Sequence, residues 1–302
     1  MRVGLDIGGT KTDAVVLDAE GGVLQRVRVP TGNGHDEVLD SAESAVREVI
    51  ALSGSDARDF TSIGVGIPGV VDSESGRVHH AVNLGVDDLE LAGLLRQRVD
   101  VPVRVENDVK AAALGAYHLL GLEGSAAFLN LGTGVAAGIV VDGRLQRGSR
   151  GGAGEIGHIP IDPHGAVCSC GQHGCVETTA SGSAVARMWP TAAELPALEL
   201  FDAADAGDRL AWSVRHTIAT GVASAVRILV LTVDVETVVI GGGLSNLGER
   251  LLAPVTEVLQ GWGVDSPFLR SLRLPERVRM LAPDLSAAAV GAALVGAAES
   301  VV

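Results

Sequence analysis

The sequence predicts an α/β protein built from two similar halves. Strand patterns alternate with helix patterns along the chain, and one strand–turn–strand pattern recurs 124 residues later, from Asp6 to Asn130. The 302 residues also suffice for two domains of ordinary size. A chain of this length buries about three quarters of the surface that it exposes when unfolded, so its core needs no disulfide.

Short aliphatic segments bounded by glycine or proline are predicted strands, and longer amphipathic segments are predicted helices. In the first half, strands are expected at residues 3–5, 14–17, 23–29, 62–67 and 103–105, and helices at 36–52, 89–98 and 108–120. In the second half, residues 128–145 repeat the first hairpin, a strand is expected at 237–240, and helices are expected at 206–229, after residue 243, and at 286–298.

The two hairpins align without a gap. Asp6 falls on Asn130, Gly8 falls on Gly132, and residues 15–18 fall on residues 139–142. Hairpins with glycine turns are common, so a chance match is the alternative interpretation. Duplication instead predicts that each half opens with a hairpin whose first turn faces a shared cleft.

Composition excludes several classes of protein. The net charge of −14 repels a phosphate backbone, and 3% aromatic residues offer few stacking platforms, so no nucleic-acid partner is expected. The mean hydropathy is +0.32, but apolar stretches such as residues 287–298 are shorter than the roughly 20 residues of a membrane span. With no apolar leader and three clustered cysteines, we expect a cytoplasmic protein without a membrane partner.

Glycine turns are candidate phosphate loops. The segment Asp6-Ile7-Gly8-Gly9-Thr10-Lys11-Thr12 follows a strand and offers backbone N–H groups, hydroxyls and one cation to an anion. Gly132-Thr133-Gly134 occupies the matching place in the second half, and Gly241-Gly242-Gly243 follows a later strand. A plain hairpin or strand-to-helix turn is the alternative for each. The 40 glycines of the chain exceed ordinary turn usage.

Asp108 follows a predicted strand and begins an alanine-rich helix. It is either an ordinary helix N-cap or a carboxylate at the ligand-binding edge of an α/β sheet.

Three cysteines and a histidine indicate a metal site. His158, Cys168, Cys170 and Cys175 lie within eighteen residues, and such a donor set suits tetrahedral Zn²⁺ in a closed, structural site. From spacing alone, His164 and His173 compete with His158 for the fourth position.

Together these segments resemble the ROK family of bacterial sugar kinases, within the actin/hexokinase/Hsp70 superfamily. They occur in the family's order between residue 3 and about residue 245, and the cysteine cluster is close to diagnostic for the family. The matching segments are residues 6–12, 64–69, 106–108, 131–134, 154–158, 168–177 and 240–243.

The resemblance implies a two-lobed, duplicated ribonuclease H-like (actin-like ATPase) fold with a structural zinc site. It implies a small N-terminal lobe of residues 1–107, on which a C-terminal helix at about residues 286–302 packs back. A large lobe of residues 108–285 would carry the zinc-binding loop at 155–177. Sugar and ATP with Mg²⁺ would bind between the lobes.

The resemblance also implies residue roles, in which Asp108 is the general base that takes the proton of the attacking sugar hydroxyl. The sugar would be bound by Gly69, Asn107, Asp108, Glu155, His158 and Glu177, with Asn83 a weaker candidate. The phosphates and Mg²⁺ would be surrounded by Asp6, Gly9, Thr10, Lys11, Thr12, Gly132, Thr133 and Gly134, and adenosine by Gly241, Gly242 and Gly243. Zinc would be held by His158, Cys168, Cys170 and Cys175.

The expected activity is therefore ATP-dependent phosphorylation of a hexose, with glucose and glucose 6-phosphate as substrate and product. N-acetylhexosamine and fructose are the alternative acceptors. A sugar-responsive transcriptional regulator and a non-catalytic sugar-binding protein are the alternatives of another class. Regulators of the family carry a helix-turn-helix ahead of the first glycine motif, whereas five residues precede Asp6 here, and this favours the enzyme. A homodimer or homotetramer is the family-based expectation.

Two segments depart from the family pattern. Val135-Ala136-Ala137 stand where glycines are usual, and their methyl groups either lower nucleotide affinity or are accommodated. Thr178-Thr179 follow Glu177 where a small residue and an aromatic residue are more usual, which leaves the preferred sugar open.

Overall fold

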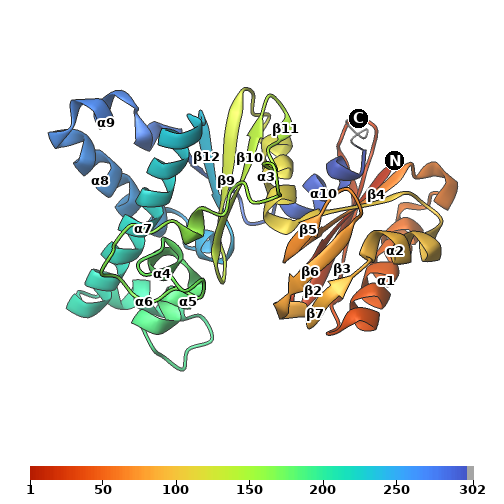
Figure 1. The fold of residues 1–302 in the computed structure, drawn as a ribbon, viewed down its shortest axis with the longest axis horizontal. Coiled ribbons are helices and arrows are strands. Elements are labelled where there is room, and N and C mark those ends of the chain that lie inside the picture. Colours follow the sequence, from red (N-terminus) through yellow and green to blue (C-terminus); the bar gives the residue numbers. More distant parts are fainter. Residues whose placement is uncertain (298–302) are drawn as a thin grey trace. The chain divides into compact units, whose positions relative to one another are not determined.

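A computed structural model describes residues 1–297, and residues 298–302 lie outside the described part of the chain (Figure 1). The chain divides into unit 1, made of residues 1–123, 138–153 and those from 284 onward, and unit 2, made of residues 124–137 and 154–283. The expected lobes met at residues 107 and 108, whereas this division places the following helix, α3 (Asp108–Leu119), in unit 1. The end of the C-terminal helix expected at 286–302 falls outside the described residues.

The strands follow the predicted alternation with helices. They are β1 (Arg2–Ile7), β2 (Lys11–Leu17), β3 (Val23–Pro30), β4 (Ser62–Ile67), β5 (Val70–Asp72), β6 (Arg77–Ala81), β7 (Val86–Leu89), β8 (Val103–Asn107), β9 (Ser125–Leu131), β10 (Val135–Val141), β11 (Arg144–Leu145), β12 (Thr237–Gly241) and β13 (Val278–Met280). The remaining helices are α1 (His35–Ser53), α2 (Leu91–Val99), α4 (Glu177–Ala180), α5 (Gly182–Met188), α6 (Pro196–Asp205), α7 (Arg209–Val233), α8 (Glu249–Asp265), α9 (Pro267–Ser271) and α10 (Ala287–Ala297).

Two five-stranded sheets share one topology. Their strand orders are β3-β2-β1-β4-β8 and β11-β10-β9-β12-β13. In the first sheet β1 is parallel to β4 and antiparallel to β2, and in the second β9 is parallel to β12. Matching strands come in the same chain order, so the duplication predicted from the repeated hairpin is confirmed.

Unit 1 has helices on both faces of its sheet. Helix α1 packs on β2 and β3, while α10 packs on β1, β4 and α3 (Figure 1). Side chains of β2 alternate between these layers: Ala14 and Val16 join the core that includes α1, whereas Val15 and Leu17 join Ala289 and its neighbours on α10. The described part of α10 thus packs on strands from the first part of the chain.

Three glycines of unit 1 provide close contact for α10. A Cβ atom at Gly4 would lie 1.9 Å from the Ala289 carbonyl oxygen, and one at Gly64 would lie 1.6 Å from the Ala292 carbonyl oxygen. At Gly115 of α3 the nearest atom would be a third carbonyl oxygen of α10, at 1.9 Å. Part of the glycine excess therefore serves helix packing rather than ligand loops.

The three-stranded sheet β5-β6-β7 was not predicted. Its strands are short, and their exposed and buried positions do not alternate cleanly: β5 reads exposed, half-buried, exposed, and β7 is buried only at its two ends. Such strands give no clear period-two hydrophobic signal.

In unit 2, helix α7 lies between several other elements. It contacts α4, α6 and α8, and more than half of its most apolar stretch is buried. Among the described residues it is the one helix that is long and apolar enough to cross a membrane, but a buried core helix has the same composition. A helix was expected at residues 206–229 from the sequence, but not as a candidate membrane span.

Candidate active site

The first glycine turn joins β1 to β2. The Gly8 amide donates to the Lys11 carbonyl at 3.0 Å, which closes the turn directly after Asp6. Gly9, Thr10 and Lys11 are exposed, as candidate phosphate contacts must be. Thr12 differs, because its side chain is fully buried and its hydroxyl lies 2.7 Å from the Thr31 hydroxyl. The described partner of the Thr12 hydroxyl is therefore a residue of unit 1.

Asp6 lies in an environment that disfavours its charged form. Burial, followed by the negative charges of Asp108 and Asp13, raises the pKa of the Asp6 carboxyl to about 7. Arg28 and Lys11 act in the opposite direction. The influence of Asp108 agrees with the topology, because β1, β4 and β8 are parallel neighbours whose carboxyl ends share one edge of the sheet.

A raised pKa makes ionisation of Asp6 unfavourable to the folded state. The unfolded chain loses this proton near the ordinary aspartate pKa of 3.8 and the folded chain near 7, so this group's contribution to stability falls as pH rises between those values. We expect Asp6→Asn, without nucleotide or Mg²⁺, to gain stability relative to wild type from pH 4 to pH 7 and to keep a constant advantage above that. Urea unfolding midpoints across this range test it, and a difference independent of pH contradicts the assignment.

Asn107 and Asp108 have different positions at the start of α3. Asn107 is the N-cap, since its Oδ1 accepts from the Val109 and Lys110 amides at 3.1 and 3.2 Å. Asp108 is the first helical residue, and its Oδ1 accepts from the Val109 amide at 2.9 Å. The interpretation of Asp108 as an ordinary helix N-cap is therefore wrong, and its carboxylate remains a candidate base at the edge of the sheet.

Gly69 lies beside Asn107, as both were expected to serve one site. The Asn107 Nδ2 donates to the Gly69 carbonyl at 3.3 Å. Gly69 has φ of 105°, and a Cβ there would lie 2.8 Å from the His79 carbonyl oxygen, so only glycine suits the position. The weaker candidate Asn83 has its backbone oxygen near Gly9 in the same unit.

In unit 2 the second and third glycine turns are neighbours. The Gly132 amide donates to the Gly134 carbonyl at 3.1 Å, two residues on, whereas the Gly8 amide donates to Lys11, three residues on. Gly241 pairs with Asn130 across the parallel strands β12 and β9. A Cβ at Gly242, whose φ is 84°, would lie 2.7 Å from the Leu131 carbonyl oxygen, so these turns lie at one edge of the sheet.

Glu177 connects the second glycine turn to the cysteine loop. Its Oε2 accepts from the Val135 amide at 3.0 Å, and its Oε1 accepts from the Ser169 hydroxyl at 3.4 Å. Sequence reasoning missed Ser183, whose hydroxyl donates to the Thr133 carbonyl at 2.6 Å. The sequence feature that could have indicated this segment is Ser181, which N-caps α5 two residues before Ser183.

Both departures from the family pattern lie in unit 2. Val135 and Ala137 are buried side chains of β10, and Ala136 is half-buried. Thr178 and Thr179 donate to the Cys175 and Val176 carbonyls at 2.7 and 2.9 Å. The threonine hydroxyls therefore have backbone partners within the turn.

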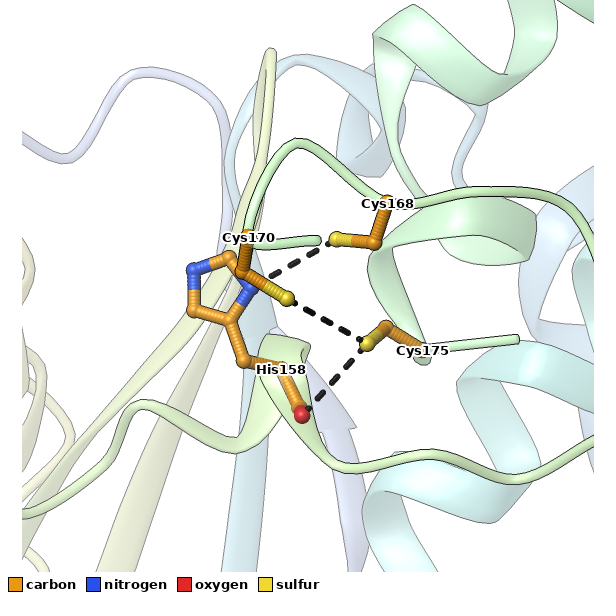
Figure 2. Close-up of side chains that lie close together, drawn as sticks. All are labelled: His158, Cys168, Cys170 and Cys175. Carbon is orange, nitrogen blue, oxygen red and sulfur yellow. Dashed lines mark hydrogen bonds between the residues drawn. The ribbon is translucent and has the colours of Figure 1, made fainter. Parts of the chain in front are cut away.

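The four expected metal ligands meet in one cluster (Figure 2). Their ligand atoms all lie within 4.8 Å of one another. The Cys168 Sγ lies 3.6 Å from the His158 Nδ1, and the Cys170 Sγ lies 3.7 Å from the Cys175 Sγ. His173 is outside the cluster and its Nδ1 lies 3.2 Å from the Gly165 carbonyl oxygen. Of the three candidate histidines, His158 is the one that lies in the cluster among the described residues.

The cysteines of this cluster have different surroundings. A hydrogen bond from the Gln172 amide lowers the pKa of the exposed Cys170 thiol to about 6. Burial raises the pKa of the Cys175 thiol to about 12. All three cysteines are free of disulfides.

The expected sugar contacts come from both units of the chain. Gly69, Asn107 and Asp108 belong to unit 1, whereas Glu155, His158 and Glu177 belong to unit 2. Glu155 is exposed and precedes the short 3₁₀ turn Ile156–His158, and His158 is half-buried. Because its Nδ1 faces the cysteines, the opposite ring nitrogen, Nε2, is directed away from the cluster (Figure 2).

A duplicated α/β fold with glycine turns at corresponding sheet edges defines the actin-like ATPase class. Comparison with known proteins is more specific, because the model of the ROK family matches residues 2–298. The chain belongs to the ROK family.

Similar proteins are described as sugar kinases. The chain is 35% identical to a glucokinase of Halalkalibacterium halodurans, over 87% of this chain and 86% of that protein. The structure of a ROK hexokinase from Thermus thermophilus matches with a TM-score of 0.81 at 33% identity, over 98% and 97% of the two chains. A ROK family glucokinase from Streptomyces griseus, in complex with glucose and AMPPNP, matches with a TM-score of 0.78 at 31% identity, over 98% of each chain.

Proposed function

We propose that this chain is an ATP-dependent hexose kinase that phosphorylates glucose at its 6-hydroxyl. The observation that carries the proposal is Asp108, a carboxylate at the start of α3 that is not the helix cap and shares a sheet edge with Asp6. The three relatives compared above are named glucokinase or hexokinase, which supports a hexose as acceptor.

Asp108 would act as the general base. As the sugar oxygen bonds to the γ-phosphorus and the bond to the leaving ADP breaks, the hydroxyl proton passes to the Asp108 carboxylate. Phosphoryl transfer has a loose transition state, so alignment of the two substrates contributes most of the acceleration. Asn107 would hold this end of α3 in place, because its side chain bonds two amides of the helix and the Gly69 carbonyl.

The glycine turns would bind the nucleotide. Gly9, Thr10 and Lys11 of unit 1 and Gly132, Thr133 and Gly134 of unit 2 would surround the phosphates, with Gly241, Gly242 and Gly243 against adenosine. Bound Mg²⁺ neutralises charge on the phosphates, which a protein of net charge −14 does not do by its overall field. Asp6 would lie next to this ion.

The cysteine cluster would hold a structural zinc ion. Tetrahedral zinc with Zn–S bonds of about 2.3 Å separates two sulfurs by about 3.8 Å and a sulfur and a nitrogen by about 3.6 Å. The separations of 3.7 Å and 3.6 Å in the cluster fit these values. Zinc bound at His158 Nδ1 would leave Nε2 for a sugar hydroxyl, so the metal would orient a substrate contact without joining the chemistry.

We expect purified protein to contain about one zinc per chain and to unfold at a lower temperature after chelation. His158→Ala should lose the metal, whereas the matched variant His173→Ala should keep it, because His173 lies outside the cluster. Metal analysis and thermal unfolding of both variants test the site. Full stability of metal-free wild type contradicts a structural role.

A coupled assay for ADP release with a panel of sugars tests the proposed activity. We expect turnover with glucose, and the panel includes fructose, N-acetylglucosamine and N-acetylmannosamine as rival acceptors. Higher kcat/KM for an N-acetylhexosamine identifies the alternative acceptor. Sugar binding without ADP release from any acceptor excludes a kinase and favours a regulator or sugar-binding protein.

A further inference from the structure

Two buried charged side chains flank Asn107 and Asp108 and have no part in the proposed chemistry. Glu106 is 2% exposed at the end of β8, and Lys110 is 6% exposed in the first turn of α3. Moving charged groups out of water is unfavourable unless each finds a partner with good geometry. Their partners therefore show what these residues hold in place.

The Glu106 Oε1 accepts from the adjacent Asn107 amide at 3.0 Å, and the remaining partners of both side chains come from one short segment of unit 1, residues 147–153. The Arg147 Nε donates to the Glu106 Oε2 at 2.6 Å, and the Lys110 Nζ donates to the Gly151 carbonyl. The segment is closed on itself, since the Ala153 amide donates to the Arg147 carbonyl at 3.1 Å. It is thus a closed loop attached at two points to the residues on either side of the Asn107-Asp108 pair.

Loop 147–153 directly precedes the segment that carries Glu155 and His158. Residues 138–153 end at a boundary of unit 1, and Gly154 and Glu155 follow at once in unit 2. Gly154 is itself fixed within unit 2, because its carbonyl accepts from the Ala137 amide at 2.8 Å and a Cβ on it would lie 1.8 Å from the Ala137 carbonyl oxygen. Displacement of the loop would therefore act directly on the segment that carries Glu155 and His158.

We propose that Glu106 and Lys110 are positioning residues that hold loop 147–153 at the start of α3 and thereby set the affinity of the enzyme for its sugar. The sugar part of this inference rests on the proposed function, whereas the attachment of the loop does not. Glu106 acts through Arg147 and Lys110 through Gly151, so neither needs to touch the substrate.

Hydrogen exchange and steady-state kinetics on the full chain together test the proposal. Arg147→Met alone would leave a buried unpaired carboxylate, so the test variant is Glu106→Gln combined with Arg147→Met, which removes both charges. Lys110→Met is the second variant, because it leaves the ion pair intact and removes only the bond to Gly151. In both we expect faster amide exchange in residues 148–153.

We expect the test variants to change KM for the sugar much more than the other kinetic constants. KM for the sugar should rise about tenfold, the effect of losing one hydrogen bond to a charged group, while kcat and KM for ATP change less than threefold. Arg147→Lys, with Glu106 unchanged, should bind the sugar more tightly than the double variant does, because it retains a cation opposite Glu106. Arg150→Met is the matched control, because Arg150 is exposed on the same loop, and we expect it to match wild type in both measurements.

The outcomes are distinguishable. Unchanged exchange in both test variants overturns the attachment, whatever their activity. Faster exchange with an unchanged sugar KM overturns the link to sugar affinity. Wild-type protein without kinase activity overturns the proposed function instead, and the exchange measurement then still decides whether Glu106 and Lys110 hold the loop.

Discussion

Asp108→Asn is expected to lose about 10²- to 10⁴-fold in kcat, the usual contribution of a positioned general base. The amide has nearly the shape of the carboxylate but cannot accept the hydroxyl proton. Asn107, not Asp108, caps α3, so the helix should start at the same residue in the variant. Sugar affinity should therefore weaken much less than turnover.

Turnover by ADP release and sugar affinity by calorimetry, measured on the same preparation, separate these effects. Asp100→Asn is the matched control, because Asp100 is exposed just before β8 begins, whereas Asp108 follows the carboxyl end of that strand. We expect the control to retain wild-type kcat. An Asp108→Asn enzyme with near-normal kcat would remove Asp108 as the base, and an equal loss in both variants would indicate a general effect of lost charge.

The parts of this fold that sequence predicted are those with a local signal. β4 was predicted at its observed bounds because its stretch of aliphatic residues and glycines ends at Pro68-Gly69. The repeated hairpin identified the duplication, and the cysteine spacing identified the cluster, because both patterns lie within short segments. His158 is an intermediate case, since spacing left three histidines and only the folded loop brings one of them to the sulfurs.

The parts that sequence did not predict depend on contacts between distant residues. Glu106 and Arg147 are 41 residues apart, and neither position has a periodic pattern that reveals the pair. Thr12 was expected near phosphate because it lies in the glycine motif, yet strand alternation turns its hydroxyl inward to Thr31. Arg147 follows β11, which is not in the sheet of β8, so local patterns do not reveal its pairing with Glu106, whereas Thr31 directly follows β3, the neighbour of β2.

Gly64 is the clearest of these distant effects, and Gly64→Ala should be strongly destabilising. Strand interiors seldom contain glycine without a reason, and here the reason is the backbone of α10. A Cβ would lie 1.6 Å from the Ala292 carbonyl oxygen and 3.0 Å from the Gly296 amide nitrogen. These are backbone atoms that no rotamer change removes, so α10 must move away from β4. Overpacking of this kind typically costs about 1–3 kcal/mol, and we expect a value at the upper end.

The control for this prediction is another glycine in the same chain. Gly261 lies in α8 with no atom within 4 Å of a Cβ placed on it, so Gly261→Ala should be neutral or stabilising by about 0.5–1 kcal/mol. Urea unfolding of both variants measures the contrast. Because α10 also packs on α3, whose first residue is Asp108, Gly64→Ala should lower kcat even where the protein is still folded. Equal stability of the two variants would show that α10 can shift freely on the sheet, and would contradict the close packing at Gly4, Gly64 and Gly115.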